Sequence, residues 1–283
     1  MRAVVVTGAA TGIGAACVDL LVEKGFLVFP SVRKESDAAA LVARHGAAVV
    51  PLRFDVTDGG AIMAAARDVE ARLEGERLAG LVNNAGVAVP GPLLHLRIDA
   101  FRHQIEVNLI GQLQVIQAFA PLLGAGEKRR GAPGRIVNMS SVAGRFAAPF
   151  LGAYNASKFG LEGMSDALRR ELMVYGVDVV LIEPGMIATP IWDKAEDVDL
   201  GMFEGTAYAA PGQRMLKWLV EQGRRAPGPE VVARAVLRAL TAPRPPARIL
   251  VVHNRLSYRV RGLLPARLID RMTARRLRLL PED

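Results

Sequence analysis

Tyr154 and Lys158 stand four residues apart in the segment GAYNASKFGLEGM, where the spacing of apolar residues predicts a helix. Residues four apart lie on one side of a helix, so the lysine cation would lie close to the phenol. A phenol with a pKa of about 10 is a poor proton shuttle near neutral pH until a positive charge favours the phenolate. The pair is therefore suited to acid–base chemistry, although an isolated pair of this kind is more often a surface tyrosine beside a solvated lysine.

Ser141 supplies a third side chain for the same chemistry. It stands just after RIVNM, a predicted strand at 135–139, and thirteen residues before Tyr154. From there its hydroxyl could hydrogen-bond the oxygen on which Tyr154 acts. The three side chains together indicate proton transfer to or from a substrate oxygen.

A glycine-rich turn, TGAATGIG at 7–14, stands between a predicted strand at 3–6 and a predicted helix. Glycine permits a tight turn and close approach of a pyrophosphate, and the helix N-terminus adds amide donors and a favourable dipole. The spacing Gly-x-x-x-Gly-x-Gly differs from the general dinucleotide fingerprint Gly-x-Gly-x-x-Gly, and a glycine-rich turn can also be an ordinary connection. On the first strand of an alternating chain it predicts a nucleotide site. The residues assigned to this site are Gly8, Ala10, Thr11, Gly12, Ile13 and Gly14.

The choice of cofactor depends on the end of the second predicted strand, in FLVFPSVRKESD. An NAD site usually has an acidic residue there to bind the ribose hydroxyls, whereas an arginine accommodates the 2′-phosphate of NADP. Val32 takes the place of the acidic residue, and Arg33 and Lys34 follow it. Because charge-assisted contacts to phosphate are strong, the sequence favours NADP(H). NAD(H) is the alternative if both cations belong only to a solvated turn.

Alternating strands and helices must position these side chains. Short valine-rich runs alternate with segments of helical spacing such as 14–25 and 100–123. Strands that are apolar throughout are buried on both faces, as in a parallel sheet between helical layers. The sequence predicts an α/β fold, a doubly wound Rossmann-type parallel sheet of about seven strands with helices on both faces, whose ligands bind beyond the carboxyl ends of the strands. The predicted strands are 3–6, 26–29, 47–52, 81–83, 135–139, 177–182 and 248–252.

The chain is expected to form one Rossmann-type domain at 1–255, followed by a basic amphipathic helical segment at 256–283. Residues 186–228 contain several glycines and prolines with weaker periodicity, which predicts a substrate lobe or lid. In the C-terminal segment, apolar residues that would form one helical face alternate with arginines. They are Leu263, Leu264, Leu268, Ile269, Met272, Leu277 and Leu280.

Composition narrows the functional classes. The chain has 283 residues, 51% of them hydrophobic, and a single cysteine, Cys17, which fits a buried thiol in a reducing, cytoplasmic compartment. The net charge of +8 could indicate a nucleic-acid partner, but the arginines gather after residue 224 among leucines rather than among exposed aromatic residues. We expect no nucleic-acid partner, no metal site and no signal peptide or spanning helix.

Further motifs follow in a fixed order: NNAG at 83–86, Asn108 in a predicted helix and PGMIAT at 184–189. Together with the glycine turn and the Ser141, Tyr154 and Lys158 set, they resemble the classical short-chain dehydrogenase/reductase family over roughly residues 2–252. The stretches SVRKESD and EPGMIATPIWDK are also similar to the steroid and retinol dehydrogenase-like branch. Each motif alone is loose, but the ordered set is specific.

The resemblance implies catalytic roles. Tyr154 would be the acid–base residue, and Lys158 would lower its pKa and bind the nicotinamide ribose. Ser141 would orient the substrate oxygen, and Asn108 would hold a water that links Lys158 to solvent.

The resemblance also implies further cofactor contacts. Asp55 would accept a hydrogen bond from the adenine amino group, Asn84 and its neighbours would line the adenosine, and Ile187 and Thr189 would close over the nicotinamide. The remaining cofactor positions are Val56, Ala85, Gly86, Pro184 and Gly185.

The substrate is less well defined by the sequence. The candidate pocket residues are mostly apolar, which favours a lipophilic substrate, although each could be ordinary core. The family resemblance implies a lipophilic secondary alcohol or ketone of steroid, retinoid or fatty type. The pocket candidates are Val87, Phe146, Phe150, Met186 and Trp192.

Function and assembly remain open at three points. The leading hypothesis is an NADP(H)-dependent oxidoreductase, and the alternatives are an NAD-dependent alcohol dehydrogenase of the same family or a non-catalytic, nucleotide-sensing protein. In this family the helices corresponding to 100–123 and 155–176 commonly form an interface, which predicts a homodimer or homotetramer. The segment 256–283 could cover the substrate entrance, contact another subunit, lie on an anionic membrane as a peripheral contact or pack on its own domain.

Overall fold

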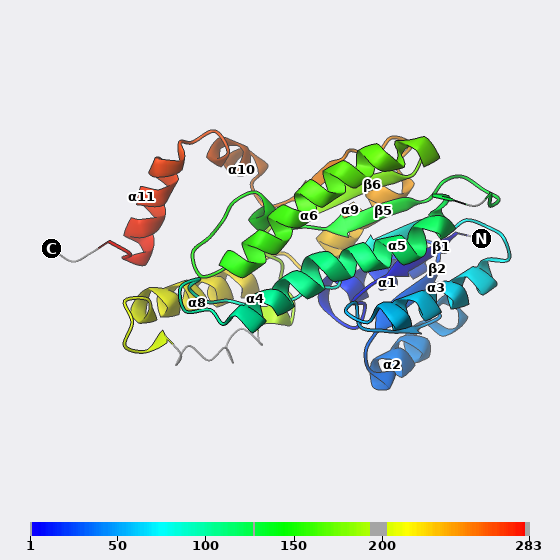
Figure 1. The fold of residues 1–283 in the computed structure, drawn as a ribbon, viewed down its shortest axis with the longest axis horizontal. Helices are drawn as coiled ribbons and strands as arrows, with labels where there is room; N and C mark the ends of the chain where they lie inside the picture. The colour runs from blue at the N-terminus through cyan, green and yellow to red at the C-terminus, as the bar shows by residue number, and fades with distance from the viewer. Residues whose placement is uncertain (1, 127, 193–202, 281–283) are drawn as a thin grey trace.

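The computed structural model describes residues 2–126, 128–192 and 203–280, and within them lies a sheet of seven parallel strands (Figure 1). The strand order is β3-β2-β1-β4-β5-β6-β7. From β1 the chain runs outward to β3 and then crosses back to the other side of β1; doubly wound sheets bind ligands at such a reversal. The predicted fold class is confirmed. The strands are β1 (Ala3–Val6), β2 (Leu27–Val32), β3 (Leu52–Arg53), β4 (Gly80–Asn83), β5 (Arg135–Met139), β6 (Asp178–Pro184) and β7 (Arg248–Val251).

Helices cover both faces of the sheet. One face carries α1 (Gly12–Glu23), α2 (Glu35–His45) and α9 (Glu230–Thr241). The other, in front in Figure 1, carries α3 (Gly59–Leu73), α5 (Gly111–Leu123) and α6 (Gly152–Glu171). The two layers enclose two separate apolar cores, one on each side of the sheet.

Strand β1 shows why the strands are apolar throughout. Val4 and Val6 point into the core beneath α1 and α9, whereas Ala3 and Val5 point into the core beneath α3 and α5. Successive side chains of a strand point to opposite faces, so a strand between two helical layers favours apolar residues on both of its faces. Cys17 of α1 lies in the first core, and burial raises the pKa of its thiol to about 12, which confirms the expected buried thiol.

The third strand differs from the prediction of 47–52. A 3₁₀ turn, η1 (Gly46–Ala48), follows α2, and Gly46 has a φ of +57°, which glycine adopts without strain. Val49 forms only an isolated parallel bridge with Val28, and the strand proper is the short β3. The 3₁₀ turn η1 takes up residues 47 and 48, with which the predicted strand began, so the observed strand begins later.

The helix predicted at 100–123 is interrupted. It consists of α4 (Ile98–Ile105), a π-helical turn η2 (Glu106–Ile110) and α5. Gly111 follows the π turn, and a β-carbon there would lie 2.7 Å from the carbonyl oxygen of Val56, so the helix approaches the end of the third strand closely. The widened turn contains Asn108 and places it in the interior.

Short helical turns and one further helix follow β5 and β6 in the chain. Ser141 caps η3 (Val142–Gly144), and η4 (Leu172–Tyr175) follows α6. The predicted lobe at 186–228 contains α8 (Ala209–Arg224); its residues 193–202 lie outside the described residues.

The predicted C-terminal helical segment is confirmed as two helices, α10 (Arg255–Arg261) and α11 (Ala266–Leu277), which stand apart from the sheet at the left of Figure 1. In the described residues, every helix is too short or too polar to cross a membrane.

Candidate active site

The glycine turn after β1 can be formed only by small residues. Gly8 and Gly12 have φ angles of +63° and +58°, which favour glycine. A β-carbon on Gly14 would lie 2.2 Å from the carbonyl oxygen of Gly8, and one on Gly8 would lie 2.8 Å from the α-carbon of Ala85. The turn leads into α1, whose N-cap is Thr11. A tight turn with no side chains in the way and a helix N-terminus beside it fits the pyrophosphate of a dinucleotide.

Thr7 and Asn84 fix the shape of this turn. The side-chain amide of Asn84 donates to the carbonyl oxygens of Thr7 and Gly8, at 3.0 and 3.1 Å. The Thr7 hydroxyl accepts hydrogen bonds from the backbone N–H groups of Asn84 and Ala85, at 2.9 and 3.0 Å. Asn84 thus links β1 to β4 through the turn. Thr7, which directly precedes the first glycine, was not among the predicted site residues.

The end of β2 presents two exposed cations. Val32 is buried, and Arg33 and Lys34 follow it on the surface. Arg33 Nη1 lies 3.7 Å from Asp55 Oδ2, so the predicted phosphate and adenine contacts are neighbours. Burial alone would raise the pKa of Asp55, but hydrogen bonds from Thr57 and the charge of Arg33 outweigh it, and the pKa is lowered. Asp55 is therefore an ionised acceptor at neutral pH.

Ser141, Tyr154 and Lys158 meet beyond the carboxyl ends of β5 and β6. Ser141 Oγ is close enough to the Tyr154 hydroxyl to lower its pKa, and it donates to the carbonyl oxygen of Pro184 at 3.5 Å. Lys158 Nζ lies 5.8 Å from the centre of the Tyr154 ring and donates to the carbonyl oxygen of Met139 at 2.7 Å. The spacing of four residues in α6 does place both side chains on one face.

Burial shifts the pKa of both Tyr154 and Lys158, and the effect on Tyr154 that the resemblance implies for Lys158 stays a prediction. Burial raises the pKa of Tyr154, and its hydrogen bond with Ser141 opposes this only in part. Burial lowers the pKa of Lys158 to about 8, and the charge of Glu162 opposes that change. The Lys158 ammonium donates its hydrogen bond to the Met139 carbonyl oxygen. Tyr154 is a neutral phenol at physiological pH, which is the form that donates a proton.

Asn108 uses its side chain to organise the backbone. Its Oδ1 accepts from the N–H of Val87 at 2.8 Å, and its Nδ2 donates to the carbonyl oxygen of Val87 and to Ser157 Oγ, at 2.9 and 3.1 Å. Ser157 in turn donates to the carbonyl oxygen of Tyr154. Asn108 therefore connects the segment after β4 to the first turn of α6. The water implied for Asn108 stays a prediction.

The residues after β6 run back across the glycine turn. Thr189 lies against Gly12, where a β-carbon would be 3.3 Å from the Thr189 methyl group. Ile187 is buried, and Gly185 donates to the carbonyl oxygen of Val251 at 2.9 Å. The glycine turn and the segment 184–189 thus meet at the carboxyl ends of the strands, where a doubly wound sheet has its ligand crevice, and Pro184 accepts a hydrogen bond from Ser141 there.

Two of the pocket candidates belong to an aromatic group at the edge of the crevice. The Phe146 ring meets the Tyr258 ring edge-on, with centres 4.9 Å apart, and Phe150 meets Tyr208 in the same way at 6.2 Å. Phe150 has a φ of +64°, a costly backbone conformation for a bulky residue. The hydrogen bond from the N–H of Gly91 to the Phe150 carbonyl oxygen, at 2.7 Å, holds it there.

The other pocket candidates have structural contacts. The indole N–H of Trp192 donates to the carbonyl oxygen of Ile187 at 2.7 Å, and a β-carbon on Gly223 of α8 would overlap its ring. Val87 is held through its backbone by Asn108, and Met186 is partly buried beside Gly185.

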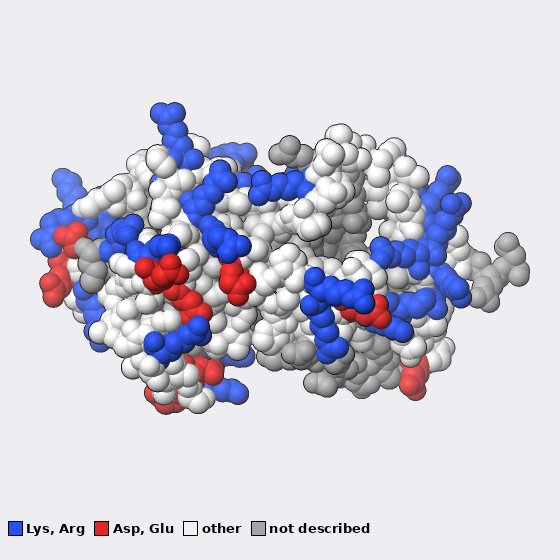
Figure 2. Space-filling view, turned by 180° about the vertical axis from the view of Figure 1, so that it is seen from behind, with Lys and Arg blue, Asp and Glu red and all other residues white. Residues whose placement is uncertain are grey.

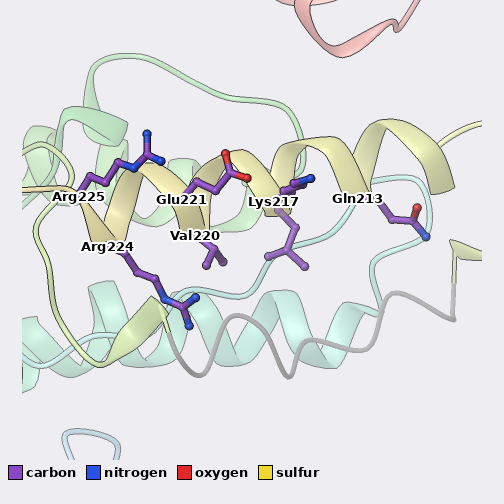
Figure 3. A pocket seen from close by; sticks show the side chains of 7 residues that line it. Gln213, Lys217, Val220, Glu221, Arg224 and Arg225 are labelled. Carbon is purple, nitrogen blue, oxygen red and sulfur yellow. The ribbon is translucent and has the colours of Figure 1, made fainter.

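Two hollows lie on this side of the molecule. One of about 470 Å³ lies beside the start of α6, and its lining combines the segments after β4 and β5 with the C-terminus. The other, about 570 Å³, lies along α8 (Figure 3), and the predicted catalytic residues Ser141, Tyr154 and Lys158 line neither hollow. The first hollow is lined by Pro92, Leu93, Leu94, Ala147, Ala148, Pro149, Phe150, Gly152, Asn155, Tyr208 and Leu279. The second is lined by Gln213, Leu216, Lys217, Val220, Glu221, Arg224 and Arg225.

The arm formed by α10 and α11 touches the domain at its two ends. Tyr258 packs on Phe146, and Arg214 of α8 donates through Nε and Nη2 to the carbonyl oxygen of Leu277, at 3.1 and 2.9 Å. The Arg276 guanidinium lies 4.3 Å from the centre of the Trp218 ring. Figure 2 shows basic side chains gathered over the arm, at the right of that view.

The apolar residues predicted to share one face of the arm are not buried together. Leu277 is buried, but Leu263, Leu268, Met272 and Leu280 are exposed. The chain turns at Arg278, which has a φ of +52°, and this turn directs Leu279 to the smaller hollow.

Comparison with known proteins agrees with this geometry. The family model described as short chain dehydrogenase matches residues 2–199, which include the glycine turn and the predicted catalytic side chains of Ser141, Tyr154 and Lys158. The chain belongs to this family.

Relatives cover the rest of the chain as well. The chain is 37% identical over 284 residues to an NADPH-dependent 3-dehydrocapnine reductase of Ornithobacterium rhinotracheale, covering all of both chains. It is 33% identical to human retinol dehydrogenase 5, covering 94% of this chain and 86% of that one. A short-chain dehydrogenase/reductase from Burkholderia phymatum, solved in complex with NAD, is similar with a TM-score of 0.77 at 26% identity, covering 100% and 96% of the two chains. The protein is thus an oxidoreductase of this family that acts on alcohols or carbonyl compounds with a nicotinamide cofactor.

Proposed function

We propose that the protein catalyses NADP(H)-dependent hydride transfer between nicotinamide and a lipophilic secondary alcohol or ketone. The observation that carries this proposal is the arrangement of Ser141, Tyr154 and Lys158 at the edge of a crevice formed by the glycine turn and residues 184–189. A protein that only senses a nucleotide has no need of a proton donor, a hydrogen-bonding partner and a cation in this arrangement.

The catalytic side chains divide the work in the direction of reduction. When bound, the cofactor supplies the hydride. Ser141 donates a hydrogen bond to the carbonyl oxygen of the substrate, and Tyr154, a neutral phenol, gives that oxygen its proton. The Lys158 ammonium stabilises the phenolate that Tyr154 leaves behind, because an opposite charge nearby favours the ionised form.

Arg33 and Lys34 support a preference for NADP(H). Both lie at the end of β2, where a 2′-phosphate would lie in a doubly wound site, and no carboxylate stands in the position of Val32. The relative of Ornithobacterium rhinotracheale is named as NADPH-dependent, which agrees with this assignment. Asp55 beside Arg33 would accept a hydrogen bond from the adenine amino group.

The apolar hollow beside α6 supports a lipophilic substrate. Leucine, proline and aromatic side chains make up most of its lining, and Leu279 of the C-terminal arm forms part of its wall. One relative is named as a retinol dehydrogenase and another as a 3-dehydrocapnine reductase. We therefore assign the arm the role of an entrance cover. Peripheral contact with an anionic membrane is the competing role for the same basic and apolar helices, and a cytoplasmic location stays a prediction.

The outer surfaces of η2, α6 and η4 support assembly into a homodimer or homotetramer. Large apolar side chains are exposed there: Ile110, Phe159, Met173 and Val174. Burying such a patch between subunits would remove apolar area from water.

The test is a panel of ketones, aldehydes and alcohols, including 3-dehydrocapnine and retinol, followed by nicotinamide absorbance with NADP(H) and NAD(H). Reduction or oxidation of a lipophilic member with NADP(H) is expected, and the Tyr154→Phe variant should lose about 10²- to 10⁴-fold in turnover with unchanged cofactor affinity. Preference for NAD(H) would favour the alcohol dehydrogenase alternative. Cofactor binding without turnover of any member would favour the nucleotide-sensing alternative.

A further inference from the structure

Glu162 lies one turn beyond Lys158 on the same face of α6, and the two residues are only 6% and 4% exposed. Buried carboxylates are uncommon unless they are paired, because removing a charge from water is costly. Glu162 therefore requires a reason that the packing of α6 alone does not give.

Arg248 of β7 holds Glu162 in place. Its Nε donates to Glu162 Oε2 at 3.0 Å, and its Nη2 lies 2.9 Å from Asp166 Oδ2, one turn further along α6. The same Nε lies 3.3 Å from Oε1 of Glu183 on β6, whose other cationic neighbour is Arg145 at 3.7 Å. One guanidinium is thus shared among three carboxylates.

This sharing leaves negative charge on Glu162 that Arg248 does not neutralise. Among the described residues, Glu162 Oε1 has no hydrogen-bond partner. In the part of the chain that the structure describes, a second cation near Glu162 is Lys158, one turn earlier on the same buried face of α6, whose ammonium donates to the uncharged carbonyl oxygen of Met139. Glu162 thus pairs directly with Arg248 and acts through its charge on Lys158, and Glu183 faces it as a like charge.

The loop that carries Ser141 is packed against the turn of α6 between Lys158 and Glu162. A β-carbon on Gly144, in the 3₁₀ turn that Ser141 caps, would lie 2.9 Å from Ser140 Oγ, 3.0 Å from the Lys158 carbonyl oxygen and 3.1 Å from Cγ of Glu162. Glu162 therefore packs next to the loop that carries Ser141 and next to the turn of α6 that carries Lys158.

We propose that Glu162 is a positioning residue of the active site: held by Arg248, it supplies the counter-charge that keeps the buried Lys158 ammonium charged and in place beside Tyr154. Burial works against that charge and lowers the pKa of Lys158 to about 8, and Glu162 raises it. The inference rests on the proposed function in one respect, namely that Lys158 acts with Tyr154.

The first test needs neither cofactor nor substrate. The chain has six lysines, so the ε-carbon signals of ¹³C-labelled lysine can be followed against pH by NMR, with Lys158→Met assigning the Lys158 signal. In Glu162→Gln the midpoint of that signal should fall by about one pH unit, because an opposite charge nearby has been removed. The matched control is Asp166→Asn, which removes the same charge and also breaks a contact with Arg248, but one turn farther from Lys158. An unchanged midpoint in Glu162→Gln, or an equal shift in both variants, would overturn the proposal.

The second test uses the reaction. The alkaline limb of the kcat profile should move to lower pH by the same amount in Glu162→Gln, with KM for NADP(H) little changed at neutral pH. Glu162→Asp keeps the charge and should restore the limb. Glu183→Gln removes the like charge that faces Glu162 and should not lower the limb, which gives a second readout if Glu162→Gln does not fold. A lowered limb in Glu183→Gln, or none in Glu162→Gln, contradicts the assignment.

The two proposals can fail separately. If the parent protein turns over no carbonyl compound or alcohol, the proposed function fails, while the NMR titration still decides whether Glu162 sets the charge of Lys158. If turnover is found and the Lys158 midpoint does not respond to Glu162, only the role of Glu162 fails.

Discussion

Replacing Arg33 with aspartate should change which cofactor the protein prefers. Arg33 lies on the surface at the end of β2, with its side chain 75% exposed, and among the described residues its ion pair is the long one with Asp55. The substitution removes a phosphate partner and introduces a carboxylate, which would repel a 2′-phosphate and accept hydrogen bonds from ribose hydroxyls. Little else in the fold depends on this side chain.

The expected size of the effect follows from this exposure. A hydrogen bond to a charged group is worth about 1.5–3 kcal/mol, but solvent screening reduces an exposed contact to about 1 kcal/mol. Repulsion between two unit charges 4 Å apart adds about 1 kcal/mol in water. The sum of about 2 kcal/mol corresponds to roughly 30-fold weaker binding of NADP(H). Lys34 beside the site lessens the loss, and Asp55 limits any gain for NAD(H) by repelling the new carboxylate.

The assay is calorimetric or fluorescence titration of both cofactors into the parent and the variant. Arg53→Asp is the matched control, because Arg53 lies at the end of the adjoining strand β3, is similarly exposed and already pairs with Glu35 at 2.9 Å. The same charge change there should leave the ratio of the two affinities nearly unchanged. An identical ratio in the parent and Arg33→Asp, or an equal change in both variants, would refute the assignment of the 2′-phosphate site.

Three further outcomes are expected. In the protein without cofactor, Lys158 should raise the free energy of unfolding as pH increases from about 8 to about 10, because the unfolded chain then keeps a proton that the folded chain has released. Urea midpoints should show this rise in the parent protein. The rise should be smaller in Lys158→Met. Deletion of residues 256–283 should raise KM for bulky hydrophobic ketones but not for small ones, and a truncated protein that is folded, has parental kinetics and has lost liposome binding would instead identify a membrane anchor. Light scattering should give a dimer or tetramer at micromolar concentration, which Phe159→Glu should dissociate, and a monomeric parent would contradict the proposed interface.

The sequence predicts those parts of the site that depend on local geometry. Tyr154 and Lys158 share a face because they are four apart in α6, whatever else the chain does. Gly8, Gly12 and Gly14 are required by the turn that they form themselves, through positive φ angles or through the approach of the turn to its own backbone. Most of the strands are likewise readable, because burial on both faces leaves a run of apolar residues at their centres, whereas the short β3 was placed wrongly.

Features that depend on distant segments could not be predicted in the same way. The side-chain amide of Asn84 binds the glycine turn, and that of Asn108 binds the backbone of Val87, contacts that join residues far apart in the chain. The pKa of Lys158 depends on its burial and on the charge of Glu162, and neither burial can be read from the sequence. Trp192 is apolar at the expected place, yet its orientation is set by the Ile187 carbonyl and by a glycine of α8.

The π turn at Glu106–Ile110 also limits how the chain can change in length. It holds one residue more than an α-helical turn, and removing that residue would rotate α4 by about 100° and shift it by about 1.5 Å relative to α5. Asn108 would then leave the backbone of Val87, and Leu109 would leave Gly160 of α6, against which it now packs. Insertions and deletions should therefore be tolerated in the connection after α5, at 124–134, and rejected between 98 and 123, where a single residue sets the rotation of α4 relative to α5.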